Sequence, residues 1–364
     1  MKVCIVTVID NVNIGTYLQA YALAKVIERR GHRAEYLDYS RPSRDNYQMF
    51  FRSFSRIKPF RWPGYWLWLI KRAAIIRRHR LFIDHYLSQR HYVGYSDVLK
   101  NPPQADIYLT GSDQVWNSFY NEGIDETFYL GFTPTDAIRV SYASSIGMNN
   151  IPEIEKKEMY KLLCKYKAIS VRESSAVKQL QDLGFDVSKI SLVLDPTLLL
   201  KENDWKDVAR AVKEDSPYLL VYSVENDMSD TLNAVAGYIA NMKRLRIVLL
   251  SHGDKSGIKC SKHYKNADPP TFLSLFLHAS YTVVSSFHGT AFSINFRKDF
   301  VTVMPNQFGS RVNSILQLCG LESRKFICGE SELSSYLSPV EYEKADIILD
   351  KMRDISYEFL HKWL

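Results

Sequence analysis

The sequence lacks several features that define common classes of protein. No G-x-G-x-x-G follows the first predicted strand, which argues against a dinucleotide-binding enzyme. The five cysteines are odd in number and scattered, without the paired spacing of a zinc site or a disulfide framework. The first segment, MKVCIVTVID, has too short an apolar run for a secretory signal. We therefore predict a cytoplasmic protein whose first residues form a buried strand.

The most aromatic stretch, RWPGYWLWLIKRAAIIRRHRLF at residues 61–82, lacks the run of roughly 20 apolar residues that a membrane-spanning helix needs. Lys71 and Arg72 interrupt it. Acidic residues are scarce there as well. Residues 41–90 contain twelve Lys or Arg but only Asp45 and Asp84, a net charge of +10 that leaves −3 for the rest of a chain whose total is +7. We predict a basic, aromatic helical insertion at about residues 41–95.

Three interpretations of this insertion follow from its composition. Basic residues interleaved with aromatic ones occur in nucleic-acid-binding proteins, but no known module surrounds them, and we expect no nucleic acid partner. Aromatic rings at headgroup level beside Lys or Arg are typical of segments that lie on an anionic membrane surface. The third interpretation is a packed insertion whose tryptophans form a core and whose arginines are solvated. The last two remain open, and the membrane-facing residues would be Trp62, Trp66, Trp68, Lys71 and Arg72.

The 364 residues suit two domains of ~100 to 200 residues each. A composition of 46% hydrophobic and 24% charged residues is normal for a soluble globular protein. Along the chain, β-branched runs end in polar loops and lead into amphipathic helices, beginning with KVCIVTVI, DNVNIG and TYLQAYALAKVIERRGH. This order predicts an α/β protein with parallel sheets.

A polar segment at residues 201–217 ends in proline and separates two cycles of this pattern. We place the first domain at residues 1–205 and the second at residues 206–364, whose last helix could pack back on the first domain. The simplest assembly is two Rossmann-like domains that face one another across a cleft. Ligands of such sheets bind beyond the carboxyl ends of the strands, where helix N-termini present backbone N–H groups. Ser, Asp and Asn at these places are also favoured helix caps, so capping is the alternative for each.

Two residues at predicted strand ends are poor helix caps. Arg172 directly follows the apolar AISV, and its fork of donors suits a carboxylate or phosphate. The alternative is an ion pair with Glu173 or another acid. His288, in SSFHGTAFSINF, precedes Gly289 and a predicted helix, a corner that suits a phosphate oxygen and proton transfer. The alternative is a core histidine bonded to a carbonyl, and no HxH or HExxH motif supports a metal.

Several segments resemble the polysaccharide pyruvyl transferase family. They occur in family order from about residue 11 to residue 324, with the basic insertion left out, and as a set they are specific. The segments are NIGTYLQAYAL, ADIYLTGSDQVWN, VSYASSIG, ISVRESS, LDPTLLL with Trp205 after it, and SSFHGTAFSINF with SRVNSILQLCGLESR.

The resemblance implies a fold similar to the two-lobed GT-B glycosyltransferases. It also implies transfer of pyruvate from phosphoenolpyruvate to a hexose of a cell-surface polysaccharide or its lipid-linked precursor, with a cyclic ketal formed and phosphate released. Arg172 and His288 match the family's catalytic arginine and histidine. Phosphoenolpyruvate would be a substrate, and neither a cofactor nor a metal is expected. The other residues proposed to hold phosphoenolpyruvate are Ser286, Phe287, Gly289 and Thr290, and those for the acceptor sugar are Asn13, Asp113, Gln114 and Ser145.

The chain departs from the family at one position. Other members often carry an arginine two residues before the histidine, where it helps to hold phosphate, and this chain has Ser286 there. Arg311, in GSRVNS, is the candidate replacement.

Two other functions remain open. One is a GT-B glycosyltransferase that uses a nucleotide sugar, because a fold does not determine a function. The other is a non-catalytic, membrane-associated scaffold for polysaccharide assembly. A lipid-linked acceptor would give the basic insertion a role as a membrane-facing surface, with the protein peripheral on the inner face of the cytoplasmic membrane.

Overall fold

The computed structural model describes residues 1–224, 228–253, 257–304 and 309–364. The chain divides into two compact units, Met1–Pro196 with Ser356–Leu364, and Thr197–Ile355. The units divide between Pro196 and Thr197, whereas the sequence suggested a boundary after residue 205. Trp205 belongs to the second unit because its ring packs on Phe292, with the centroids 5.3 Å apart.

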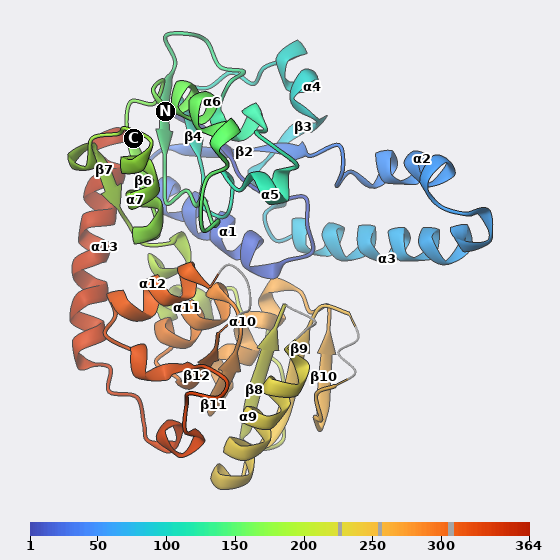
Figure 1. Ribbon diagram of the computed structural model, residues 1–364, viewed down its shortest axis with the longest axis vertical. Helices are drawn as coiled ribbons and strands as arrows, with labels where there is room; N and C mark the ends of the chain where they lie inside the picture. The colour runs from blue at the N-terminus through green and yellow to red at the C-terminus, as the bar shows by residue number, and fades with distance from the viewer. Residues whose placement is uncertain (225–227, 254–256, 305–308) are drawn as a thin grey trace. The chain divides into compact units, whose positions relative to one another are not determined.

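The first unit is built on a parallel sheet with the order β3-β2-β1-β4-β5 among the described residues (Figure 1). Bridges from Val140 to Ala168 and from Ser144 to Val171 extend it towards a small sheet, β6-β7. The direction of strand order reverses between β1 and β4, so their carboxyl ends form a topological switch point. The strands are β1 (Lys2–Val6), β2 (Arg33–Ser40), β3 (Leu87–Val93), β4 (Ile107–Thr110), β5 (Ile138–Ser141), β6 (Ile169–Val171) and β7 (Ile190–Leu192).

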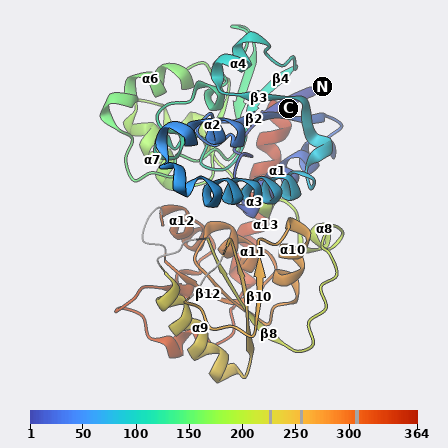
Figure 2. The same cartoon turned by 90° about the vertical axis from the view of Figure 1, so that its right-hand side faces the viewer.

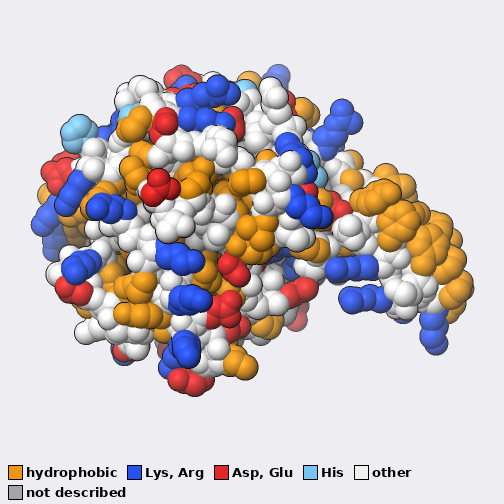
Figure 3. Space-filling model, turned by 90° about the horizontal axis from the view of Figure 1, so that it is seen from above, with side chains coloured by type: hydrophobic (Ala, Val, Ile, Leu, Met, Phe, Trp, Pro, Cys, Tyr) orange, Lys and Arg blue, Asp and Glu red, His pale blue; other side chains and the backbone are white. Residues whose placement is uncertain are grey.

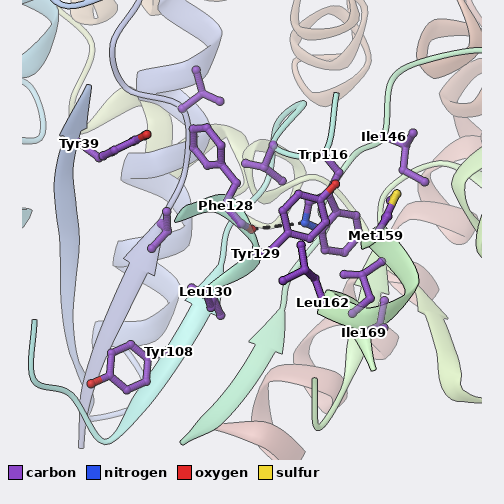
Figure 4. Close-up of a cluster of buried hydrophobic side chains, with 14 of the residues drawn as sticks. Tyr39, Tyr108, Trp116, Phe128, Tyr129, Leu130, Ile146, Met159, Leu162 and Ile169 are labelled. Carbon is purple, nitrogen blue, oxygen red and sulfur yellow. Dashed lines mark hydrogen bonds between the residues drawn. The ribbon is translucent and has the colours of Figure 1, made fainter. Parts of the chain in front are cut away.

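Helices cover both faces of this sheet. On one face lies α1, where the Tyr36 hydroxyl of β2 donates to the Ala20 carbonyl at 2.8 Å. The opposite face carries a large aromatic core, in which Trp116 Nε1 donates to the Phe128 carbonyl at 3.4 Å (Figure 4). The helices are α1 (Ile14–Glu28), α2 (Asn46–Arg56), α3 (Trp62–Arg80), α4 (Tyr95–Lys100), α5 (Ser118–Asn121), α6 (Glu153–Leu163) and α7 (Ser174–Asp182).

The second unit repeats the arrangement with the order β10-β9-β8-β11-β12-β13 in its described part, and Figure 1 labels β8 to β12. Its switch point lies between β8 and β11. One face packs against α9, and Phe272 of α10 and Phe292 of α11 pack together on the other. The strands are β8 (Tyr218–Ser223), β9 (Arg246–Ser251), β10 (Lys262–Lys265), β11 (Tyr281–Val284), β12 (Asp299–Val303) and β13 (Lys325–Phe326). The helices are α8 (Glu202–Lys206), α9 (Ser229–Lys243), α10 (Pro269–His278), α11 (Phe287–Asn295), α12 (Ser310–Leu318) and α13 (Glu343–Trp363).

The last helix, α13, contributes its final residues to the first unit. Ser356 Oγ accepts a hydrogen bond from the Leu194 backbone N–H at 3.0 Å. Arg30, just after α1, donates to the Tyr357 carbonyl at 2.7 Å. The end of the chain is therefore a structural part of the first unit.

The basic insertion is a helical hairpin of α2 and α3, which lie side by side (Figures 1 and 2). Trp62 and Trp66 stack with centroids 5.7 Å apart, and Trp66 also contacts Phe50 of α2 at 5.3 Å. These two tryptophans therefore hold the hairpin together, as the packing interpretation requires. Within the described ranges, no helix has the length and apolar content that a transmembrane span requires.

The predicted membrane-facing residues do not share one environment. Trp68 and Lys71 are exposed, whereas Arg72 is only 7% exposed. Arg72 donates to the Asp10 carbonyl at 3.0 Å and to the Asn46 side chain. Arg72 is thus an anchor for α3 and not part of an exposed surface, which corrects the prediction for this residue.

Ion pairs fix the base of the hairpin to the sheet. Arg41 binds the Asp10 carboxylate through Nη2 at 2.6 Å and Nε at 2.9 Å, with both side chains buried. His91 of β3 contacts Asp38 at 2.8 Å and Asp45, the cap of α2, at 3.7 Å. Hydrogen bonding of the His91 ring N–H groups to the carboxylates of Asp38 and Asp45 raises the pKa of His91 to about 9.

We expect the His91 contacts to make stability depend on pH. Because the folded pKa of about 9 lies above the ordinary value of 6.5, protonated His91 stabilises the fold fully below pH 6.5. This contribution is lost as the pH rises through about 9. His91→Gln should lower Tm at pH 6 and have little effect at pH 10, as measured by circular dichroism melts. His361→Gln, at an exposed position on α13, is the control. A deficit that stays constant from pH 6 to pH 10 would show that charge on His91 is not the cause.

Candidate active site

Arg172 follows β6, and its guanidinium lies among three carboxylates of the first unit. Nη1 is 2.6 Å from Asp195 Oδ2, Nη2 is 3.3 Å from Asp113 Oδ1, and Nε is 3.5 Å from Glu173 Oε2. Burial opposes the positive charge, but Asp195, Asp113 and Glu173 outweigh it and raise the pKa of Arg172 above its ordinary value. The geometry supports the ion-pair alternative for Arg172, in a cluster whose ionised groups sum to −2.

Hydroxyl groups complete this carboxylate cluster. Ser112 Oγ donates to Asp195 at 2.8 Å, Ser145 Oγ donates to Glu173 at 2.7 Å, and Thr16 Oγ1 donates to Asp113 at 3.0 Å. These residues follow β4 and β5 or begin α1. The structure therefore brings together three residues that the sequence singled out, which are Asp113, Ser145 and Arg172.

Two further acceptor candidates have local structural roles. Asn13 caps α1, because its side chain accepts from the Gly15 N–H at 3.0 Å. Gln114 Oε1 accepts from Asn117 Nδ2 at 2.8 Å, and its side chain covers Gly147, where φ is +62° and a Cβ would overlap it. The capping alternative holds for Asn13. Gln114 contacts the carboxylate cluster through its backbone, whose N–H donates to Asp113 Oδ1 at 2.9 Å.

Sequence reasoning did not select Ser112, Glu173 or Asp195 as site residues. Of these three residues, Asp195 matters most to the site, since its carboxylate lies nearer to the Arg172 guanidinium than those of Asp113 and Glu173. The signal was present in LDPTLLL, where an acid follows an apolar run and precedes a proline. An acid at the end of a buried strand needs a cationic or hydrogen-bonding partner, and Arg172 was the evident cation.

In the second unit, His288 lies in the first turn of α11, directly after β11 at the switch point. Ser286 caps this helix, and its Oγ accepts from the Gly289 N–H at 3.2 Å. Gly289 is required by close packing, because a Cβ there would lie 2.9 Å from Val284 Cβ and 3.0 Å from a Tyr222 ring carbon. The helix N-terminus therefore sits directly on the sheet.

The neighbouring candidates fit the same helix start. Phe287 precedes His288, with the two ring centroids 5.3 Å apart. Thr290 is fully buried, and its hydroxyl bonds the Ser286 carbonyl and Thr302 Oγ1, both at 3.0 Å. Ser286 and Thr290 thus stabilise the connection between β11 and α11.

Arg311 is the second residue of α12, the helix that follows β12. Because β12 pairs with β11 in parallel, α11 and α12 both begin at the carboxyl edge of the sheet. A residue that binds phosphate in place of the missing arginine would have to lie at this edge, as Arg311 does.

The two sheet edges differ in chemistry. The first offers carboxylates and hydroxyls, which suit the hydroxyls of a sugar. The second offers the N-terminus of α11 with a histidine in its first turn, which suits an anion that must also receive a proton. Within the residues that the structure describes, no group of three or more His, Cys, Asp or Glu side chains is arranged to hold a metal ion.

Comparison with known proteins supports the resemblance seen in the sequence. The model of the family described as "Polysaccharide pyruvyl transferase" matches residues 13–307, most of the chain, and confirms the predicted family. No curated protein sequence matches this chain.

Solved structures confirm the fold. The UDP-GlcNAc 2-epimerase from Methanocaldococcus jannaschii is 13% identical, with a TM-score of 0.51 and coverage of 100% of this chain and 99% of that chain. The epimerase from Neisseria meningitidis bound to UDP-GlcNAc is 10% identical, with a TM-score of 0.52 and the same coverage of 100% and 99%. At these identities the likeness shows the fold alone, which is the predicted pair of Rossmann-like domains of the GT-B type.

Arg172→Leu should lower the free energy of unfolding by about 3 to 5 kcal/mol, because it leaves buried carboxylates without their cation. Urea denaturation at pH 7 measures the loss. Part of it should be recovered at pH 5, where the carboxylates can take up protons. The control is Arg210→Leu, since the ion pair of Arg210 with Asp268 at 2.8 Å has a guanidinium side chain that is 60% exposed. That change should cost less than about 1 kcal/mol. Equal, small losses in both variants would contradict the ion-pair role of Arg172.

Proposed function

The chain belongs to the polysaccharide pyruvyl transferase family, and on this premise we propose that it transfers pyruvate from phosphoenolpyruvate to two hydroxyls of one hexose. The products are a cyclic ketal and phosphate, and the hexose belongs to a cell-surface polysaccharide or its lipid-linked precursor. The observation that carries the proposal is His288 in the first turn of α11, at the switch point of the second sheet and within the matched residues.

The proposed donor site is the carboxyl edge of the second sheet. Phosphoenolpyruvate carries a phosphate and a carboxylate, and backbone N–H groups at a helix N-terminus favour such an anion. Gly289 supports this role because it lets α11 begin close to the sheet. Arg311, at the start of α12, is proposed to bind the phosphate in place of the arginine that Ser286 replaces.

The proposed acceptor site is the carboxylate cluster of the first unit. Asp113 and Glu173 are proposed to accept hydrogen bonds from sugar hydroxyls, and a carboxylate can take the proton of the attacking hydroxyl. The three carboxylates around Arg172 would repel phosphoenolpyruvate, since their summed negative charge exceeds the positive charge of the guanidinium. We therefore assign Arg172 as a positioning residue for the carboxylates, in place of the direct donor contact that the family resemblance implies.

The proposed reaction has two bond-forming steps. A sugar hydroxyl adds to C2 of phosphoenolpyruvate, its proton passes to a base, and the methylene carbon C3 accepts a proton to become a methyl group. The oxygen of a second hydroxyl then bonds to C2 as the C2–O bond to phosphate breaks, and the proton of that hydroxyl leaves with the phosphate, which closes the ketal. His288 is proposed as the general acid that delivers the proton to C3 or assists the departure of phosphate.

His288→Ala should reduce phosphate release from phosphoenolpyruvate by roughly 10²- to 10⁴-fold, because positioned acid–base groups contribute rate factors of this size. The assay contains a hexoside acceptor, and mass spectrometry of the product should show the addition of one pyruvate less one water. His278→Ala is the control, since His278 is exposed on α10. Retention of more than a tenth of the wild-type rate would remove His288 from the essential groups. Product that contains a sugar from a nucleotide sugar, with no turnover of phosphoenolpyruvate, would support the glycosyltransferase alternative instead.

Arg172→Lys separates the two roles considered for Arg172. Lysine keeps the positive charge but loses the fork that reaches separate carboxylates. If Arg172 positions the acceptor site, KM for the acceptor should rise at least tenfold with little change in KM for phosphoenolpyruvate. The reverse pattern would establish Arg172 as a direct donor ligand and overturn the positioning role.

A further inference from the structure

The proposed reaction leaves one exposed surface of the first unit without a role. This surface is the outer part of the α2–α3 hairpin, residues 47–71, here called the hairpin tip. Figure 3 shows hydrophobic side chains gathered over the projecting hairpin, with Lys and Arg side chains beside them. Phe60 is 79% exposed, Tyr47 69% and Ile70 66%. Leu67, Phe51 and Trp68 are each about half exposed. Exposed apolar groups that are clustered in this way mark an interaction surface.

These side chains are exposed because the hairpin already has an aromatic interior. The stacked pair of Trp62 and Trp66 packs between the helices, and the half-exposed Phe54 lies against it, with its ring centroid 5.0 Å from that of Trp62. Trp66 Nε1 also donates to Ser53 Oγ at 3.0 Å. The outer rings therefore do not pack inside the hairpin and are available to a partner.

The charge of the tip indicates the chemistry of that partner. No Asp or Glu occurs between Asp45 and Asp84 in the sequence. Three cations of the tip, Arg56, Lys58 and Arg61, line a hollow of about 810 Å³ together with Phe60 and Tyr65. Among the described residues, no carboxylate forms an ion pair with any of these three cations. The surface therefore combines exposed aromatic rings with an uncompensated positive charge.

We propose that the hairpin tip docks on a lipid bilayer that carries anionic phosphate headgroups. The exposed rings enter the headgroup region, and Arg56, Lys58 and Arg61 bind headgroup phosphates. A second copy of the chain is a poorer partner, because a symmetric contact would bring two acid-free, positively charged tips together. The described helices do not span the bilayer, so the tip lies on the membrane and does not cross it.

The base of the hairpin connects this surface to the proposed acceptor site, and this step rests on the proposed function. Arg41 and Arg72 both bind Asp10, in the loop that leads into α1. In the first turn of α1, Thr16 donates to Asp113 of the carboxylate cluster. A helix of the length of α3 spans roughly 28 Å at 1.5 Å per residue. A docked tip therefore keeps the acceptor site within that order of distance of a lipid-linked sugar.

Co-sedimentation of the full chain with vesicles tests the docking. The vesicles contain phosphatidylcholine alone or phosphatidylcholine mixed with phosphatidylserine. We expect the wild type to pellet with the anionic vesicles at low salt, at least tenfold more than with the neutral ones, and less as salt is added. The aromatic variant Phe60→Ser with Trp68→Ser, and the charge variant Arg56→Gln with Lys58→Gln and Arg61→Gln, should each lose at least tenfold in binding. The matched control is Ile154→Ser with Ile347→Ser, which removes side chains that are 91% and 72% exposed outside the hairpin.

Three results would overturn the proposal. The first is a wild type that stays in the supernatant with anionic vesicles. The second is an aromatic variant that binds as the wild type does, which would show attraction by charge without entry of the rings. The third is a wild type that dimerises through the tip in light scattering without vesicles, which would assign the surface to a second copy.

Turnover measurements keep this test separate from that of the proposed function. With phosphoenolpyruvate and a short, water-soluble hexoside, the hairpin variants should match the wild-type rate, because their residues contact neither proposed substrate site. A wild type without turnover would refute the proposed function, while vesicle binding would still decide the docking. Loss of soluble-acceptor turnover in the hairpin variants would refute a separate docking role for the tip.

Discussion

A single buried guanidinium holds the carboxyl edge of the first sheet together. Arg172 follows β6 and contacts Asp113, which follows β4, and Asp195, which follows β7. Without a cation at their centre, Asp113, Glu173 and Asp195 would repel one another in a region of low dielectric, where unpaired charge is costly. Hydroxyls of Ser112, Ser145 and Thr16 then satisfy further carboxylate oxygens. The loops of this edge are therefore held in an arrangement in which each carboxylate has Arg172 or a hydroxyl group as a partner.

The two units use the same strand order for different chemistry. In both, the strand order reverses at a central pair of parallel strands, which opens the edge of the sheet at that point. The first unit fills its edge with acids around Arg172. In the second unit, the N-terminus of α11 lies at this edge, where Gly289 allows close packing and Ser286 caps the helix. One edge is suited to neutral hydroxyls and the other to an anion, the two chemistries that the proposed reaction between a sugar and phosphoenolpyruvate needs.

The fold could be predicted from the sequence because its signals are local. Apolar runs such as KVCIV and YTVV, each followed by a polar loop and a helix, determine a parallel α/β sheet without knowledge of distant contacts. His288 could be placed at a strand-to-helix corner for the same reason. Of the partners of Arg172, the adjacent Glu173 could be named from the sequence. Asp113 and Asp195 could not be paired with Arg172, because they lie 59 and 23 residues away in the chain. Arg72 shows the same limit. It lies four residues after the exposed Trp68, so helical spacing predicts a shared face, but its long side chain reaches Asp10 and Asn46, which only the folded chain brings near.

Because the helices α2 and α3 contain no acidic residues, their positive charge and their aromatic rings would act at different stages of an encounter with a surface. Out to about 10 Å, the Debye length at 0.1 M salt, the positive charge of the hairpin attracts any polyanion, nucleic acid included, and added salt shortens this range. Only at contact do the rings of residues such as Phe60 and Trp68 distinguish a fluid, partly apolar layer from a hydrated polymer. The association rate would thus fall as ionic strength rises. The dissociation rate would fall as more rings enter an apolar environment.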